Sequence, residues 1–163
     1  MRQRFEQQFQ LGTLQISDTE ISSKTRDAQP KLAIALLLLF NTPEYNERLF
    51  VVLEKKICGK KKKTGRQGMD LWQIFVLAMF RMTLNISYDR LHTMANSDSM
   101  LRQLLGIETE SGFKKQQMNY QTIKDNLDLL DDVFLREINQ IIVDFGNNEV
   151  FKKRGGGITL KNG

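Results

Sequence analysis

The segment LWQIFVLAMFRMTLN, residues 71–85, is apolar on nearly every side and carries a single charge, Arg81. It lacks the strict alternation of apolar and polar side chains that a half-buried strand would show. Asp70, immediately before it, is a favourable N-cap residue. These features predict a helix buried on all sides, which would lie at the centre of the fold with other helices packed around it.

The rest of the chain shows no convincing strand pattern, so the expected fold class is all-α, a multi-helix bundle. Apolar residues recur at helical spacing, with capping residues before the segments and glycines after them. Residues 1–10 could form a short helix, and residues 11–30 predict a loop or arm. The expected helices are 31–40, 43–58 after Thr42, 88–96 after Ser87, 99–105 after Ser97 or Asp98, 120–130 after Asn119 and 131–146, with Gly59, Gly106 and Gly146 as stops.

A length of 163 residues allows one domain, or one domain with a small extension. The stretch KKKKTGRQGMD interrupts the helical pattern with charge and two glycines. The expected organisation is therefore an N-terminal helical region at 1–59 that could dimerise, a basic linker at 60–70, a helical DNA-binding domain at 71–150, and a disordered tail at 151–163.

Several classes of protein are excluded by what the sequence lacks. One cysteine, Cys58, and one histidine, His92, cannot build a zinc finger. There is no secretory signal, and the apolar run 32–40 is too short to cross a bilayer, so a cytoplasmic protein is expected. No nucleotide-binding or nucleophile motif occurs, and Asp131-Asp132 is interpreted as a helix start rather than a metal pair. We therefore expect no enzyme activity, no cofactor and no small-molecule substrate.

The positive charge favours DNA as the partner. The formal net charge is +5, and Lys60, Lys61, Lys62, Lys63 and Arg66 lie within seven residues. Such a run can contact phosphates without regard to base sequence. The alternative is that it forms a solvated hinge.

Base recognition would need a second element. The short helices expected at 87–95, 97–105 and 119–130, joined by brief turns, match the layout of helix-turn-helix modules. Gln and Asn can bond adenine edges, and Lys can bind phosphate or guanine. An ordinary surface face is the alternative, since Asp125 and Asp128 would oppose deep insertion. The expected DNA-binding residues outside the basic run are Gln121, Thr122, Lys124 and Asn126 on the third helix and Arg90 on the first.

An ordered set of motifs resembles a known family. These are Thr64-Gly65-Arg66 with Gly68 and Asp70, then Tyr88-Asp89-Arg90-Leu91, Leu101-Arg102 through Leu105-Gly106, and YQTIKDNL at 120–127. Over roughly residues 1–153 the chain resembles the N-terminal region of bacterial insertion-sequence transposases of the DDE class, in the IS-five-like and ISNCY groups.

The resemblance implies a helical part that binds the terminal inverted repeats of the mobile element in the bacterial nucleoid. In the family, an RNase H-like domain that follows carries an Asp-Asp-Glu triad and two metal ions, usually magnesium. This chain lacks that triad, so the resemblance implies a truncated fragment that binds DNA without cutting it. Such a fragment could form a homodimer or associate with an intact transposase.

The last residues depart from the family at RGGGITLKNG, Arg154–Gly163. A one-base shift of reading frame can convert this segment into one ending in Leu-Lys-Thr-Asp, which resembles the family's first catalytic segment. The tail is therefore interpreted as out-of-frame sequence, with a genuine glycine-rich tail as the alternative. The rival to the whole interpretation is a helical interaction module that dimerises through residues 31–58, or a small DNA-binding regulator with no role in transposition.

Overall fold

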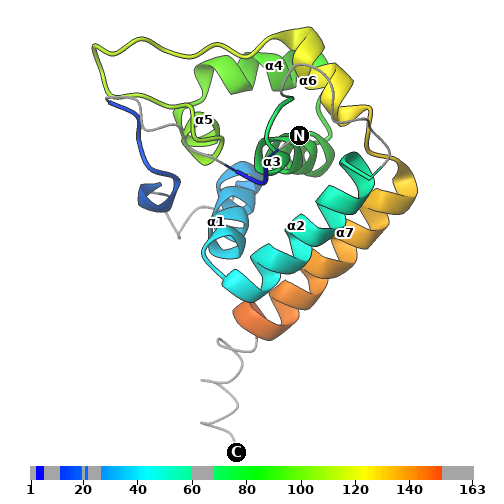
Figure 1. The fold of residues 1–163 in the computed structure, drawn as a ribbon. Helices are drawn as coiled ribbons and strands as arrows, with labels where there is room; N and C mark the ends of the chain where they lie inside the picture. The colour runs from blue at the N-terminus through cyan, green and yellow to red at the C-terminus, as the bar shows by residue number, and fades with distance from the viewer. Residues whose placement is uncertain (1–2, 6–11, 20, 22–26, 60–67, 152–163) are drawn as a thin grey trace, which may run out of the picture.

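The computed structural model describes residues 3–5, 12–19, 21, 27–59 and 68–151. Within these ranges the chain is helical, and its one β feature is an isolated bridge between Thr13 and Thr109. The predicted all-α fold class is confirmed (Figure 1). The elements are a 3-10 helix (Ile16–Asp18), α1 (Ala28–Phe40), α2 (Pro43–Ile57), α3 (Leu71–Leu84), α4 (Tyr88–Ser97), α5 (Ser99–Leu104), α6 (Tyr120–Leu127), α7 (Asp132–Phe145) and a π-helical turn (Gly146–Phe151).

Helix α3 lies at the centre of the molecule, and helices α1, α2, α4 and α6 pack against it (Figure 1). Every residue from Ile74 to Phe80 is buried. Trp72 is fully buried, and its indole Nε1 donates a hydrogen bond to the carbonyl oxygen of Leu104 at 2.8 Å. The central buried helix predicted from residues 71–85 is therefore confirmed.

The start of α3 is capped differently from the sequence-based expectation. Asp70 occupies the N-cap position, but its side chain makes no capping hydrogen bond. Instead the amides of Leu71 and Trp72 donate to the carbonyl oxygens of Gln3 and Arg4, each at 3.0 Å. The expected helix at residues 1–10 is accordingly wrong for residues 3–5, whose carbonyls face α3 instead of continuing a helix of their own. Phe9 and its neighbours lie outside the described residues.

Arg4 fixes this N-terminal segment to α2. Its guanidinium forms ion pairs with Glu47 at 2.5 Å and with Glu54 at 2.7 Å. Hydrogen bonds from the guanidinium to Glu54 and Glu47 raise the pKa of Arg4 above its ordinary value. All three side chains are more than a third exposed, so these pairs fix the position of the segment more than they add to stability.

Helices α2 and α7 lie side by side and run in opposite directions (Figure 1). Tyr45 packs edge-on against Phe145 with ring centroids 5.3 Å apart, and the Asn148 amide donates to the Tyr45 hydroxyl at 3.0 Å. Lys56 pairs with Asp131 at the other end. The helices before and after residues 60–70 therefore contribute to one hydrophobic core. None of the helices in the described part of the chain is long and apolar enough to cross a bilayer.

Four helices start at caps that the sequence identified. The side chains of Ser87, Asp98, Asn119 and Asp131 accept hydrogen bonds from backbone amides in the first turns of α4, α5, α6 and α7. Gly146 does not stop the last helix as expected. It keeps a right-handed helical backbone, with φ −56° and ψ −47°, and the chain continues into the π-helical turn.

The expected brief turns hold for only one of the two connections around α5. Asp98 alone separates α4 from α5, whereas residues 105–119 separate α5 from α6. We call residues 105–119 the connecting segment. A compact arrangement of three short helices joined by tight turns is therefore not present, and the connecting segment runs across the surface in Figure 1.

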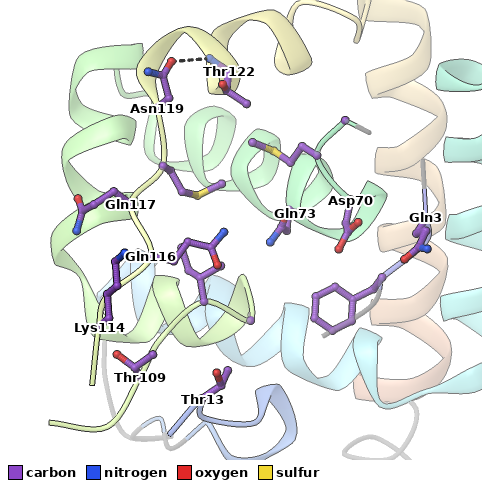
Figure 2. Close-up of a pocket in the computed structure, with 16 residues that line it drawn as sticks. Gln3, Thr13, Asp70, Gln73, Thr109, Lys114, Gln116, Gln117, Asn119 and Thr122 are labelled. Atoms are coloured by element: carbon purple, nitrogen blue, oxygen red, sulfur yellow. Dashed lines mark hydrogen bonds between the residues drawn. The ribbon is translucent and has the colours of Figure 1, made fainter. Parts of the chain in front are cut away.

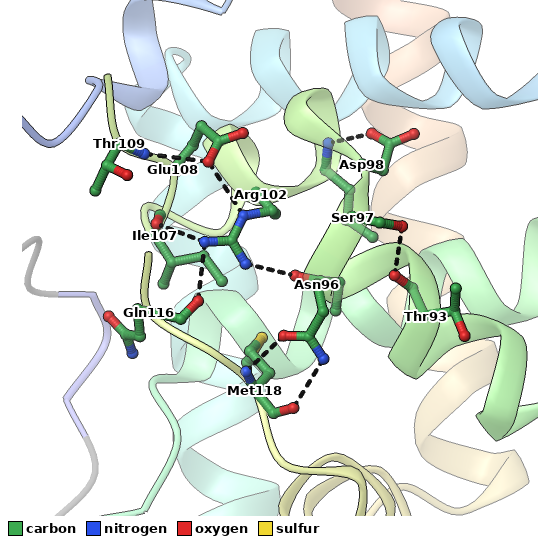
Figure 3. A network of polar contacts seen from close by, with 12 residues as sticks. Thr93, Asn96, Ser97, Asp98, Arg102, Ile107, Glu108, Thr109, Gln116 and Met118 are labelled. Carbon is green, nitrogen blue, oxygen red and sulfur yellow. Dashed lines mark hydrogen bonds and ion pairs between the residues drawn. The ribbon is translucent and has the colours of Figure 1, made fainter. Parts of the chain in front are cut away.

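Arg102 holds the connecting segment in place (Figure 3). Its side chain is fully buried and pairs with buried Glu108 at 3.1 Å. It also donates to the carbonyl oxygens of Ala95 at 3.0 Å, Ile107 at 3.2 Å and Gln116 at 2.8 Å. Asn96 adds a second attachment, since its amide accepts from the Met118 backbone amide at 2.7 Å and donates to the Met118 carbonyl at 2.9 Å.

Two glycines of the connecting segment allow a matched test of how the N-terminal segment packs. Gly106 and Gly112 both have positive φ, at 73° and 91°. A Cβ at Gly106 would lie 2.7 Å from Cζ of Phe5, whereas a Cβ at Gly112 would meet nothing within 4 Å. Gly112→Ala should cost about 1–2 kcal/mol of unfolding free energy from backbone strain alone. Gly106→Ala should cost about 1–3 kcal/mol more, because the added methyl displaces Phe5.

Urea unfolding of the two variants measures this difference. Equal losses would mean that Phe5 does not pack on Gly106 in solution.

Candidate nucleic-acid interface

A polar pocket of about 470 Å³ opens beside the N-terminal end of α3. Its walls come from the N-terminal segment, the start of α3, the connecting segment and the first turn of α6. Figure 2 shows Asp70 just before α3, Gln73 on α3, Asn119 and Thr122 at the start of α6, and Thr13 and Thr109 on the opposite side. Elements far apart in sequence thus build one cavity, which sequence periodicity does not predict.

The connecting segment supplies the pocket with amide and ammonium groups. Lys114, Gln116 and Gln117 are exposed and line the pocket, and their side chains have no hydrogen-bond partner among the described residues. The backbone carbonyl of Gln116 is held by Arg102, so this part of the segment is fixed while its side chains face solvent. Gln73 donates its amide to the Leu105 carbonyl at 3.0 Å, which leaves its side-chain oxygen as an acceptor.

The pocket lining includes the residues that follow the basic run in the sequence. Lys60–Lys63 and Arg66 lie outside the described residues, but Gly68 and Met69, the first described residues after them, line the pocket. Half of the 24 lysines and arginines lie outside the described residues, whereas most of the 19 acidic residues lie within them. The positive balance of the chain is therefore carried mainly by segments that adjoin the helices.

The four α6 residues expected to bind DNA lie in different environments. Gln121 and Thr122 are exposed, and the Gln121 amide donates to Asp125 at 2.6 Å. Lys124 is partly exposed and lies 3.4 Å from Asp128. The prediction that Asn126 faces outward is wrong: its residue is 7% exposed, and its amide donates to the Thr122 carbonyl at 2.6 Å. A buried Asn engaged with its own helix is not placed to contact base edges.

Arg90 is exposed on α4, so it stays available for a phosphate contact. Tyr88, two residues earlier, lies under the Arg81 guanidinium at 4.1 Å from its ring centroid and donates to Asp128 at 2.9 Å. Burial raises the pKa of the Tyr88 hydroxyl, and the bond to Asp128 adds to this rise. The same bond holds the pKa of Asp128 below its usual value. The outward surface of α6 therefore carries ionised Asp128, which opposes close approach of DNA at that end.

Sequence reasoning missed the pocket residues of the connecting segment. The signal was present as FKKQQMN, two lysines followed by two glutamines, between residues 113 and 119. The stretch shows no helical period, so the sequence alone predicts only a polar loop there. Its place in the pocket wall depends on its attachment to α5 through Arg102 and to α4 through Asn96.

The weaker candidates from the sequence have structural explanations. Asp131 accepts a hydrogen bond from the Phe134 amide at 2.8 Å, as expected for a helix cap. His92 contacts the Met118 carbonyl through Nε2 at 3.1 Å and packs edge-on against Tyr120. Cys58 is partly buried after α2. Among the described residues, no group of three or more His, Cys, Asp or Glu side chains is placed to hold a metal ion.

Comparisons with protein-family models, with curated proteins and with solved structures found no match to this chain.

Proposed function

We propose that this chain is the DNA-binding N-terminal part of a DDE-class transposase and that it binds the terminal inverted repeats of its element. The sequence resemblance over residues 1–153 supplies the family. The observation that carries DNA binding is the amide-lined pocket, whose lining includes Gly68 and Met69, the described residues that follow the basic run in the sequence. This arrangement supports two kinds of contact from one surface, phosphate binding by lysines and base contacts by amides.

In this proposal the lysines provide affinity for DNA, and the amide side chains near the pocket orient the protein on the bases. Lys60–Lys63 and Arg66 would neutralise phosphates and release counterions. Lys114 and Lys115 are exposed on the connecting segment and would add further phosphate contacts. Gln116, Gln117 and Gln121 are the exposed amides that could reach base edges.

The salt dependence of DNA binding tests the proposal. Each phosphate contact that is lost should reduce the slope of log K against log salt by about 0.9. Replacing Lys60, Lys61, Lys62 and Lys63 with alanine should therefore flatten the slope by roughly 3–4 and weaken binding to every sequence alike. Fluorescence anisotropy measures both effects on two duplexes, one with the element's terminal repeat and one of unrelated sequence. The salt concentration is varied from about 50 to 200 mM, a range over which phosphate contacts lose much of their affinity.

A control with the same change in charge separates the effect of lysines near the pocket from the effect of net charge alone. Lys31 and Lys55 are exposed on α1 and α2, and neither lines the pocket. Lys31→Ala with Lys55→Ala should change the slope little, whereas Lys114→Ala with Lys115→Ala should flatten it by about 2. A wild-type chain that does not shift either duplex at low salt would contradict DNA binding.

One further observation favours a second candidate function, self-association. A mainly apolar groove of about 410 Å³ lies between α2 and α7, with Val51, Val52 and Ile141 in its lining. Val51 is 50% exposed at this groove. Glu47, Arg48 and Glu137 surround it, so a second copy related by a twofold axis could bring opposite charges together. Absence of DNA binding at low salt would leave this interaction module as the function to pursue.

A further inference from the structure

The polar pocket beside α3 has the size of a small-molecule site. Its volume of about 470 Å³ falls within the range of roughly 300–1,000 Å³ that ligand pockets occupy. It is far too small for a duplex, whose recognition needs an extended surface. The pocket therefore fits one unit of a polymer or one free small molecule.

The chemistry of the lining points to a ligand with both hydrogen-bond donors and acceptors. The Gln73 oxygen presents an acceptor, while the Gln116 amide presents both a donor and an acceptor. The Thr109 hydroxyl is buried and has no hydrogen-bond partner in the described structure. Figure 2 shows Thr109 across the cavity from Gln73. A lining with both donors and acceptors suits the edge of a nucleobase better than it suits a simple anion.

Two other parts of the pocket match the rest of a nucleotide. Phe5 lines the pocket and is braced edge-on by Phe40, with ring centroids 5.9 Å apart, so an aromatic side chain is available for stacking. Lys114 is exposed at the lining and can neutralise one phosphate.

We infer that this pocket binds one unpaired nucleotide of the DNA, with its base inside against Phe5 and its phosphate at Lys114. This inference rests on the proposed DNA-binding function and adds to it the kind of DNA that the chain prefers. A base inside a duplex cannot present its pairing edge to a protein pocket, so the nucleotide has to leave the stack or be unpaired already. The chain should then prefer DNA with a bulge or unpaired end over fully paired DNA.

The test compares two duplexes of about 30 base pairs with the same sequence, one fully paired and one with a single bulged nucleotide. At one salt concentration the wild-type chain should bind the bulged duplex about tenfold more tightly, as two or three neutral hydrogen bonds and a stacking contact would give. Thr109→Val combined with Gln116→Leu should abolish this ratio. Thr109 has no described hydrogen-bond partner to lose, and Gln116 attaches to Arg102 through its backbone, so both substitutions should preserve the fold.

Gln140→Leu on α7 is the matched control, because it removes an exposed glutamine whose amide contacts only Asp144 among the described residues. It should leave the ratio near tenfold. Equal affinity of the wild type for both duplexes, or a ratio that persists in the double variant, would overturn the inference while leaving DNA binding intact. Failure to bind either duplex would overturn the proposed function and this inference with it. Tight binding of a free mononucleotide without preference for the bulge would reassign the pocket to a small molecule.

Discussion

Replacing Arg102 with methionine is expected to lower the free energy of unfolding by about 3–5 kcal/mol. The guanidinium is fully buried, and its removal leaves Glu108 as a buried charge without its ionic partner. It also removes the donors from three backbone carbonyls, at Ala95, Ile107 and Gln116. Urea unfolding followed by circular dichroism measures the loss. A loss below about 1 kcal/mol, typical of an exposed pair, would contradict the buried network.

A double variant separates the charge from the packing. Arg102→Met with Glu108→Leu removes both charges together, so it should recover part of the stability that Arg102→Met alone loses. Burial on its own would raise the pKa of Glu108, but hydrogen bonds from Arg102, Ser99 and the Thr109 amide leave it below its ordinary value. A carboxylate with a lowered folded-state pKa stabilises the fold above its unfolded pKa and loses that contribution as pH falls through the folded pKa. Below about pH 4 the wild type should therefore lose stability more steeply than the double variant.

Trp72→Ala should destabilise the protein by a similar amount, about 3–5 kcal/mol. The indole is fully buried and lies 4.9 Å from the ring centroid of Phe40 and 5.7 Å from that of Phe75. Its loss would leave a cavity where α1, α3 and the end of α5 meet, and would remove the hydrogen bond to Leu104. Thermal unfolding monitored at 222 nm, a wavelength that reports α-helix, would show the change as a lower midpoint.

Trp72→Phe is the control for this prediction, because it keeps most of the apolar volume and loses the indole N–H. It should cost less than the alanine variant, with the remaining loss reflecting the unpaired Leu104 carbonyl and the smaller ring. Equal losses in the two variants would mean that the hydrogen bond, and not packing, sets the contribution of Trp72.

The parts of the fold that local sequence determines were predicted well. Helix α3 was predicted because a long apolar run without helix breakers is typical of a buried helix. The caps at Asn119 and Asp131 were predicted because capping depends on residues only a few positions apart. The right-handed backbone at Gly146 shows the limit of this reasoning. Glycine permits a stop without requiring one, and the contact between Asn148 and Tyr45 accompanies the continued helix.

The candidate site was harder to predict because it depends on contacts between distant segments. Asn126 looks outward on a simple helical projection, yet α6 packs against both α3 and α4 and therefore buries more than one stripe. Arg102 looks like a surface charge in sequence, and only the fold shows that four acceptors surround it. The pocket needs residues that lie as far apart in the sequence as Gln3 and Thr122, so no local pattern could indicate it.

The pairing of α2 with α7 has a consequence for how the protein is made. Tyr45 and Asn148, which this pairing brings into contact, are 103 residues apart in the chain. At about 5–20 residues per second, a ribosome needs roughly 5–20 s after completing α2 to synthesise α7. For that interval the face of α2 that carries Tyr45 lacks its partner helix, and an uncovered apolar face is prone to aggregate. Newly made chains should thus depend on chaperones or on a low concentration of nascent chains until α7 has been translated.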